Sequence, residues 1–422
     1  MTPAPPGAWP GSWPGDLDEF RAALRDWCGA HVPGVWRREQ AGASDEEFVS
    51  FQKWWFSELR QAGLAVPHWP SQWGGGMPVL HQIVLYQELA AHDAPRLVLA
   101  FVAIHHTAST LLADGTDEQR RRHLPAILDG EIWAQGFSEP EAGSDLASLR
   151  TTARKDGERY VVSGQKLWAS GAMHADWCLL LARTDPGAPK RRGISYFLLD
   201  LRTPGIDIRP IRQATGEAHF CEIFLNDVEI PATQLVGAEN AGWQVAQRTL
   251  AAERGMTMLE LAERLGNAGF RWLLDACARV GPDGRRAIDD SLVADRLAGF
   301  ETEIAGLRAL CRSLVERHEA GTAGGSAGSP PRAGTAGAAD ASIVKLYYSE
   351  LLQRMTGFGA EVAGLPAHTE LRKPASSGWE SGAWVLDFIG SWEWTIPGGT
   401  SEIQRTIIGE RGLGLPREPA AG

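Results

Sequence analysis

Two neighbouring segments, FSEPEAGSD at residues 137–145 and YVVSGQKLWAS at residues 160–170, decide how the rest of the chain is interpreted. Pro140 and Gly143 predict a loop in the first segment, and a glycine lets backbone N–H groups approach a ligand closely. The second segment predicts a strand, a Ser-Gly turn and a second short strand that carries Trp168 at its exit. A hydroxyl-bearing loop opposite an indole indicates a site for a flat, polar cofactor.

The two segments resemble the signature region of the acyl-CoA dehydrogenase flavoproteins, Thr/Ser-Glu-Pro-x-Ala-Gly-Ser-Asp followed by Gly-x-Lys-x-Trp-x-Thr/Ser. The resemblance implies FAD as cofactor, with Ser138 and the turn Gly143-Ser144 contacting the isoalloxazine and the substrate thioester. It places Trp168 and Ser170 against the opposite flavin face, and Phe137 in the same cofactor-binding loop. The alternative is a β-hairpin with an ordinary buried tryptophan.

Composition and charge narrow the class of protein. A chain of 422 residues that is 44% hydrophobic and 22% charged predicts a globular protein of two or three domains. Its net charge of −11 argues against a nucleic-acid-binding surface, which requires a basic stripe. The longest apolar run, residues 97–104, is too short to cross a bilayer.

Cysteine and histidine usage predicts a cytoplasmic protein without a metal site. The five cysteines are widely spaced and include no Cys-x-x-Cys, which predicts reduced thiols rather than a disulfide frame. The pair His105-His106 lacks a third ligand at useful spacing, so packed histidines are expected there. Residues 1–16 lack the basic start and apolar core of a signal peptide, and we expect a flexible lead-in.

Hydrophobic periodicity divides the rest of the chain into three parts. Residues 17–131 carry apolar stripes at helical spacing, and residues 132–236 carry short strand signals bounded by turn residues. Residues 237–422 are helical again, with long helices that favour an antiparallel bundle. The Gly/Ala/Ser-rich stretch 321–339 predicts a mobile loop. The resemblance implies the same α+β fold: an N-terminal α-helical domain, a middle β-domain and a C-terminal four-helix bundle.

A second cofactor contact is predicted near the C-terminus. The segment GTSEIQR at residues 399–405 matches the C-terminal signature of the same family, which implies that Thr400 and Glu402 hydrogen-bond FAD. From its residue type, Thr400 is a good helix N-cap, and a capped helix without a ligand is the alternative. The motifs GFG at 357–359 and GLG at 412–414 do not complete a dinucleotide-binding fingerprint.

Desaturation of an acyl thioester needs a base for the α-proton while a hydride leaves the β-carbon for flavin N5. Glu253 shares a helical stripe with Ala246 and Leu250, so we expect it to face an apolar interior, where burial raises a carboxylate pKa. Family members with a C-terminal base carry it at the position of Gly398 here. The Glu253-Arg254 pair instead resembles the Glu-Arg base of long-chain and isovaleryl-type members, whereas a surface ion pair is the alternative.

These observations predict an FAD-dependent acyl-CoA dehydrogenase acting on a CoA or carrier-protein thioester, with Glu253 as base. The alternatives are a flavin oxidase or monooxygenase of the same fold and a non-catalytic subunit. The resemblance implies an electron-transfer flavoprotein as partner. Arg279 is not followed by the Phe-Gly turn of many members, which leaves a homodimer, a homotetramer and an α2β2 assembly open.

Overall fold

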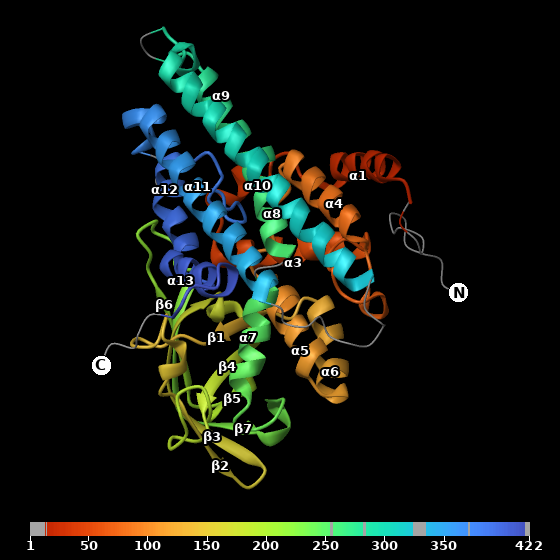
Figure 1. Ribbon diagram of the computed structural model, residues 1–422, viewed down its shortest axis with the longest axis vertical. Helices are drawn as coiled ribbons and strands as arrows, with labels where there is room; N and C mark the ends of the chain where they lie inside the picture. The colour runs from red at the N-terminus through yellow and green to blue at the C-terminus, as the bar shows by residue number, and fades with distance from the viewer. Residues whose placement is uncertain are drawn as a thin grey trace. The chain divides into compact units, whose positions relative to one another are not determined.

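A computed structural model describes residue 13 and residues 15–253, 256–281, 284–323, 335–369 and 372–417. Contacts between residues divide the chain into two compact units. Unit 1 comprises Met1–Pro10, Ala43–Gly76 and Leu97–Glu253, and unit 2 comprises Gly11–Gly42, Met77–Arg96 and Arg254–Gly422. Figure 1 labels the helices and strands of both units, which are described separately.

The centre of unit 1 is an eight-stranded sheet with the strand order β6-β7-β3-β2-β4-β5-β8, in which β1 pairs with β4 in parallel. Its inward side chains are aliphatic or aromatic and form one buried cluster, which explains why the alternating sequence patterns fold as strands. All four strands predicted between residues 177 and 225 lie within observed strands. The strands are β1 (Trp133–Gly136), β2 (Thr152–Asp156), β3 (Arg159–Ser170), β4 (Trp177–Arg183), β5 (Ile194–Asp200), β6 (Ile206–Ile211), β7 (Phe220–Pro231) and β8 (Leu235–Val236).

Strand β3 differs from the prediction, because residues 160–170 form one strand rather than two strands joined by a turn. The long antiparallel partner β7 pairs with β3 along its length and absorbs the irregular residues as register shifts at Val162/Gly164 and Lys166/Ala169. Gly164 has φ 156°, and a Cβ there would lie 2.5 Å from Thr151 Oγ1. This glycine therefore permits a bulge beside β2 instead of a turn.

Two helices of unit 1, α3 and α6, begin at capping signals of the sequence. Ser44 and Glu47 form a capping box at the start of α3, and Thr116 and Gln119 form another at the start of α6. The stretch at residues 97–112 is apolar nearly all round, which predicts one buried helix. In the structure its helical backbone begins at Phe101 and contains a π-helical segment, η2. The helical elements are α3 (Asp45–Gln61), η1 (Ser71–Trp73), η2 (Val102–Thr107), α5 (Ala108–Asp114), α6 (Asp117–Leu128), η3 (Leu146–Ser148), η4 (Ala172–His174), η5 (Ala232–Gln234) and α7 (Gly242–Glu253).

Unit 2 is helical, and its core joins helices from both ends of the chain. Helix α4 packs against α1 and α8, and α10 packs against α11 and α8 around a cluster of buried aliphatic and aromatic side chains. The helical elements are α1 (Leu17–His31), α2 (Trp36–Gln40), α4 (Val79–Ala91), α8 (Met256–Arg264), η6 (Leu265–Gly269), α9 (Phe270–Ala278), η7 (Ala287–Asp289), α10 (Ser291–Ala323), α11 (Thr335–Ala367), α12 (Trp384–Ser391), η8 (Trp392–Thr395), α13 (Ser401–Ile407) and η9 (Ile408–Gly412).

The structure changes two parts of the helical prediction, the grouping of residues 17–131 and the extent of the loop at 321–339. Residues 17–131 are shared between the two units, because α1 packs against α4 and α4 packs against α8 in unit 2, whereas α3, α5 and α6 belong to unit 1. The stretch predicted as a mobile loop, 321–339, is helical at both ends, since α10 runs to Ala323 and α11 begins at Thr335. Residues 324–334 lie outside the described residues.

Candidate cofactor and thioester site

A buried ion pair fixes the loop at residues 137–145 to strand β3. Lys166 is fully buried, and its Nζ lies 2.7 Å from Glu139 Oε1 and donates to the Phe137 carbonyl at 3.2 Å. The Glu139 carboxylate also accepts from the backbone N–H groups of Arg150 and Thr151 at 2.6 and 2.9 Å. Every partner that the two charges need is thus supplied inside unit 1.

The same contacts set the ionisation of the pair. Burial raises the pKa of Glu139, but the Lys166 ammonium and the backbone donors outweigh it and hold that pKa below its usual range. Burial lowers the pKa of Lys166, and Glu139 partly offsets the shift. The loop is therefore held by two opposite charges that depend on each other.

Strand β3 presents Trp168 outward beside this loop. Leu167 N donates to Ser138 O at 2.9 Å, which brings the loop against the strand one residue before Trp168. Trp168 has φ 63° within the second bulge of β3, and its side chain is 54% exposed. Its ring meets Phe220 edge-on at 6.0 Å, and this exposure contradicts the alternative of an ordinary buried tryptophan.

The other loop residues predicted to contact the cofactor fall into two groups. Gly143 and Ser144 are exposed, and a Cβ at Gly143 would meet no atom within 4 Å. Ser170 is exposed on β3, and Ser138 is half-buried. Phe137 differs, because its side chain is buried edge-on to Tyr196 at 5.7 Å. Phe137 can contact a ligand only through its backbone.

The predicted base ends helix α7. The buried face of α7 includes Val245, Ala246 and Thr249, and Thr249 Oγ1 lies 2.6 Å from Thr110 Oγ1. Glu253 follows Thr249 by four residues and Ala246 by seven, which places it on the same face of an ideal helix. The side chain of Glu253 and residue Arg254 lie outside the described part of the chain.

In unit 2, Thr400 caps α13 as predicted, because its Oγ1 accepts from Ile403 N at 3.3 Å. Glu402 is exposed, and its own N–H and the Thr400 hydroxyl lower the pKa of its carboxyl. The carbonyls of Gly398 and Gly399 both accept from Gln404 Nε2, and Lys345 Nζ also donates to Gly399 O. The turn that precedes Thr400 is therefore fixed.

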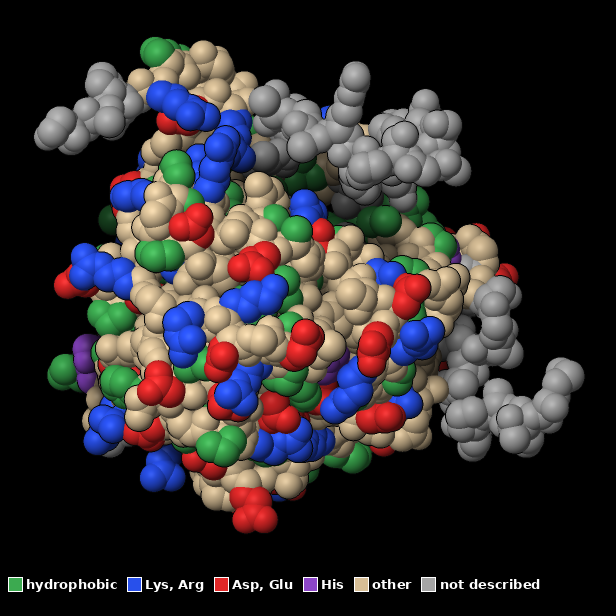
Figure 2. Space-filling view, turned by 90° about the horizontal axis from the view of Figure 1, so that it is seen from below, with side chains coloured by type: hydrophobic (Ala, Val, Ile, Leu, Met, Phe, Trp, Pro, Cys, Tyr) green, Lys and Arg blue, Asp and Glu red, His purple; other side chains and the backbone are tan. Residues whose placement is uncertain are grey.

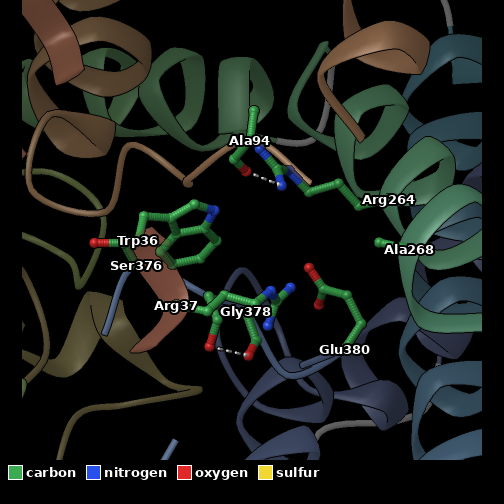
Figure 3. A pocket seen from close by; sticks show the side chains of 9 residues that line it. Trp36, Arg37, Ala94, Arg264, Ala268, Ser376, Gly378 and Glu380 are labelled. Carbon is green, nitrogen blue, oxygen red and sulfur yellow. Dashed lines mark hydrogen bonds between the residues drawn. The ribbon is translucent and has the colours of Figure 1, made fainter. Parts of the chain in front are cut away.

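A separate cavity in unit 2 is too small for a cofactor (Figure 3). Trp36, Arg37, Arg264 and Glu380 contribute to its walls, and its volume is about 10 Å³, which is the space of roughly one water molecule. The Arg264 guanidinium donates to Ala94 O at 2.9 Å, as Figure 3 shows. This cavity is a packing feature and no dinucleotide site.

The sequence motif did not reveal the role of Lys166. A lysine at an inward position of a buried strand needs a carboxylate partner, and Glu139 already stood in the quoted loop.

The histidines pack as expected: His105 stacks on His68 with ring centroids 4.7 Å apart, and burial, then His68 and His106, lower the pKa of His105 well below its ordinary value. Among the described residues, no group of three or more His, Cys, Asp or Glu could hold a metal ion.

Charged side chains of both signs mix on one face of the molecule, and the cysteines are buried. On the face in Figure 2, Lys and Arg side chains are interspersed with Asp and Glu side chains and form no basic stripe. All five cysteines are buried and free. Within the part of the chain that the structure describes, helices long and apolar enough to cross a membrane are absent.

Comparison with known proteins decides the family. Residues 15–131, 134–228 and 240–413 match the models of the N-terminal, middle and C-terminal domains of acyl-CoA dehydrogenase. The chain is 37% identical over 412 residues to the acyl-CoA dehydrogenase IpdE1 of Mycobacterium tuberculosis, covering 96% of this chain and 99% of the relative. The chain belongs to the acyl-CoA dehydrogenase family. This confirms the resemblance, the predicted fold and an oxidoreductase of this flavin-dependent class.

Solved structures of related proteins have the same fold as this acyl-CoA dehydrogenase. The Tcur3481–Tcur3483 steroid ACAD matches with a TM-score of 0.75 and 29% identity, covering 95% of this chain and 98% of that chain. The ChsE4–ChsE5 complex from Mycobacterium tuberculosis matches with a TM-score of 0.75 and 29% identity, covering 97% and 100%. IpdE1 of Mycolicibacterium smegmatis is 34% identical over 418 residues, covering 96% of this chain and 99% of that relative.

Proposed function

We propose that this acyl-CoA dehydrogenase binds FAD and catalyses α,β-dehydrogenation of an acyl thioester carried by CoA or a carrier protein. The exposed Trp168 indole beside a loop held by the Glu139–Lys166 pair is the observation that carries the proposal. A positive φ strains the backbone of a residue other than glycine, and such strain is found most often at functional sites. A large exposed aromatic side chain is likewise typical of a binding site. Its flat apolar face suits the ring system of a flavin.

The residues around Trp168 fit the polar edges of that cofactor. Ser138, Ser144 and Ser170 supply hydroxyls, and Gly143 leaves room for close approach of a ring. Thr400 and Glu402 on α13 would hold a further polar part of FAD. When bound, FAD supplies the two-electron acceptor for the reaction. The chain itself supplies binding, orientation and the proton acceptor.

We assign the proton acceptor to Glu253. In the sequence it follows Ala246 by seven residues and Thr249 by four, the spacing of one helical face, and both of those side chains are buried. A carboxylate held away from water has a pKa raised toward neutrality. Such a carboxylate takes the α-proton of a thioester far better than a solvated one. Gly398, at the position of the other family base, has no side chain that could serve.

The test is the Glu253→Gln variant, which keeps the shape of the side chain and removes its basicity. We expect the rate of thioester-dependent flavin reduction to fall by about 100-fold or more, with the bound flavin retained. Glu118→Gln, on the exposed first turn of α6, is the matched control and keeps full activity. Full turnover by Glu253→Gln with flavin bound contradicts the assignment.

We also propose partners for the enzyme. The relatives Tcur3481–Tcur3483 and ChsE4–ChsE5 are named as pairs of proteins, which supports an α2β2 assembly over a homo-oligomer. Arg279 is followed by Val280-Gly281 in place of a Phe-Gly turn, and Val280 forms an isolated antiparallel bridge with Arg286. An electron-transfer flavoprotein is the proposed electron acceptor, and five free buried cysteines suit a cytoplasmic location. Rapid oxygen consumption without an added acceptor would indicate an oxidase instead.

A further inference from the structure

The register shift in the second half of β3 turns Trp168 and Ser170 to the outer face of the sheet. Lys166 is buried, and regular alternation along the strand would bury residues 168 and 170 on the same side. The shift between Lys166 and Ala169 reverses the alternation, so that Ala169 is buried and both of its neighbours are exposed. The two side chains proposed to contact the flavin from this strand therefore share one face with the outward side chains of β7.

Phe220 is the residue of β7 that lies beside these two side chains. It pairs with Ser170 across the antiparallel ladder, and residues directly opposite each other in such a ladder carry their side chains on the same face. The ring centroids of Phe220 and Trp168 are 6.0 Å apart, and the ring planes meet at 86°, an edge-to-face arrangement. The Phe220 side chain is half-buried, whereas Trp168 is 54% exposed. Phe220 is thus the better-packed ring of the pair.

The backbone at Phe220 is held on both edges of β7. On the β3 side, Gly171 N donates to His219 O at 2.7 Å, next to the position where Phe220 pairs with β3. On the other side β7 pairs with β6, where Ile211 lies opposite Phe220. Trp168 instead occupies the bulge, with φ 63°, where the pairing of β3 with β7 is interrupted. The sheet therefore fixes Phe220 more firmly than Trp168, and Phe220 can support the indole.

Resting on the proposed function, we infer that Phe220 is a positioning residue for the cofactor, because it holds the Trp168 indole in the orientation that meets the flavin ring system. An exposed indole has several side-chain rotamers, and each rotamer turned away from the flavin lowers the fraction of the protein that is ready to bind it. The edge-on contact with Phe220 favours one of these rotamers. Phe220 belongs to neither signature segment of the sequence, and it acts through Trp168 rather than on the substrate.

The experiment is a double-mutant cycle on the FAD affinity of the full chain, measured by adding FAD back to flavin-depleted protein and following flavin fluorescence. Phe220→Leu keeps an apolar side chain but removes the ring, and we expect it to weaken FAD binding about three- to fivefold, whereas Phe220→Tyr retains the affinity. In the Trp168→Ala background, Phe220→Leu has no further effect, since its role requires the indole. Phe224→Leu is the matched control, because Phe224 lies on the same face of β7 but packs against Arg209, and its affinity for FAD is unchanged.

A second readout reports on the indole itself and requires no flavin. In protein labelled with 5-fluorotryptophan, the ¹⁹F resonance of Trp168 is identified as the signal lost in Trp168→Phe. We expect this resonance to shift in Phe220→Leu and to stay in place in Phe224→Leu. An FAD affinity of Phe220→Leu equal to that of the wild type, or the same loss with and without the Trp168 indole, overturns the inference. A protein that takes up no FAD contradicts the proposed function instead, so the two failures are distinguishable.

Discussion

The two segments proposed to contact FAD are held in place by different interactions. The loop at 137–145 is fastened by a fully buried ammonium, Lys166, paired with the buried carboxylate of Glu139. The turn before α13 is fastened by Lys345 and Gln404, whose nitrogens donate to backbone carbonyls. Both segments use a buried lysine: Lys166 pairs with a buried carboxylate, whereas the hydrogen bond of Lys345 named here goes to a neutral backbone carbonyl.

This difference predicts how each segment responds to loss of one partner. Removal of Lys166 leaves a carboxylate uncompensated in a low-dielectric interior, which is among the costliest defects in a protein. Removal of Lys345 leaves Gly399 O with the Gln404 amide as a donor. The first segment therefore contains a buried charge that one substitution leaves without its counter-charge, whereas the contacts named for the second go to neutral carbonyls.

The largest expected effect is that of Lys166→Met. We expect the free energy of unfolding to fall by about 3–5 kcal/mol, because Glu139 remains buried without its partner. The double variant Lys166→Met/Glu139→Gln should recover most of this loss, since no charge is left inside. Urea unfolding of both variants is the measurement. A single variant as stable as the wild type would remove the basis of the comparison.

The second prediction concerns two buried carboxylates whose pKa values are shifted in opposite directions, so that stability depends on pH in opposite ways. Burial raises the pKa of Asp387 to about 7, although Ser381 and Gly382 donate to it. Its folded state binds a proton more tightly than the unfolded chain, so the free energy of unfolding should fall as pH rises from about 4 to about 7, by at most about 4 kcal/mol. The lowered pKa of Glu139 acts in the opposite direction, with stability lost as acidic pH is approached.

Thermal or urea unfolding as a function of pH, with wild type and Asp387→Asn, tests this prediction. The variant should lose the decline between about pH 4 and 7, because the group that titrates there is gone. A wild-type profile that rises throughout this window would contradict the raised pKa of Asp387.

Trp168→Ala should weaken flavin retention by about tenfold with little change in stability, because the side chain is 54% exposed. Trp168→Phe should lose less. Trp392→Ala is the matched control, since Trp392 on η8 is 53% exposed and outside the proposed site. The absorbance of flavin that remains after gel filtration gives the result. Equal retention by the Trp168 and Trp392 variants would reject the assignment.

The smallest effect concerns the cap of α13. Thr400→Ala should cost about 1 kcal/mol of stability and lower flavin retention several-fold. Ser44→Ala removes a comparable cap from α3 and should cost similar stability without affecting flavin. Thermal unfolding and flavin absorbance separate the two roles. Loss of stability alone in Thr400→Ala would leave α13 as a capped helix without a ligand.

The sequence predicted those helices and strands whose ends are set by residues close to them in the chain, such as turn residues and helix caps. Turn residues around positions 206–211 predict a strand there, and Thr116-Asp117-Glu118-Gln119 predicts a helix start. The structure has β6 at 206–211 and the capping box of α6 at Thr116. Strand β3 was predicted as two pieces because its continuity depends on β7, some sixty residues away. The short helix α12 was missed, since eight residues among glycines and serines give little periodic signal.

For the proposed site, the motifs indicated the loop, Trp168 and the cap at Thr400, because each depends on residues that are close together in the sequence. The pairing of Lys166 with Glu139 could not be predicted from the sequence, because residue spacing alone does not show that Glu139 lies against β3. The same holds for Gln135, whose Oε1 lies 2.7 Å from Nδ1 of His106, 29 residues away in the sequence. Pairings between elements distant in sequence are a property of the folded chain.

The most direct test of the account is the visible spectrum of the purified protein during anaerobic titration with acyl-CoA thioesters. The account predicts a yellow protein whose oxidised-flavin absorbance bleaches on addition of a thioester and persists with free CoA or the free acid. A colourless protein that takes up no FAD, or a flavin that no thioester bleaches, would contradict it.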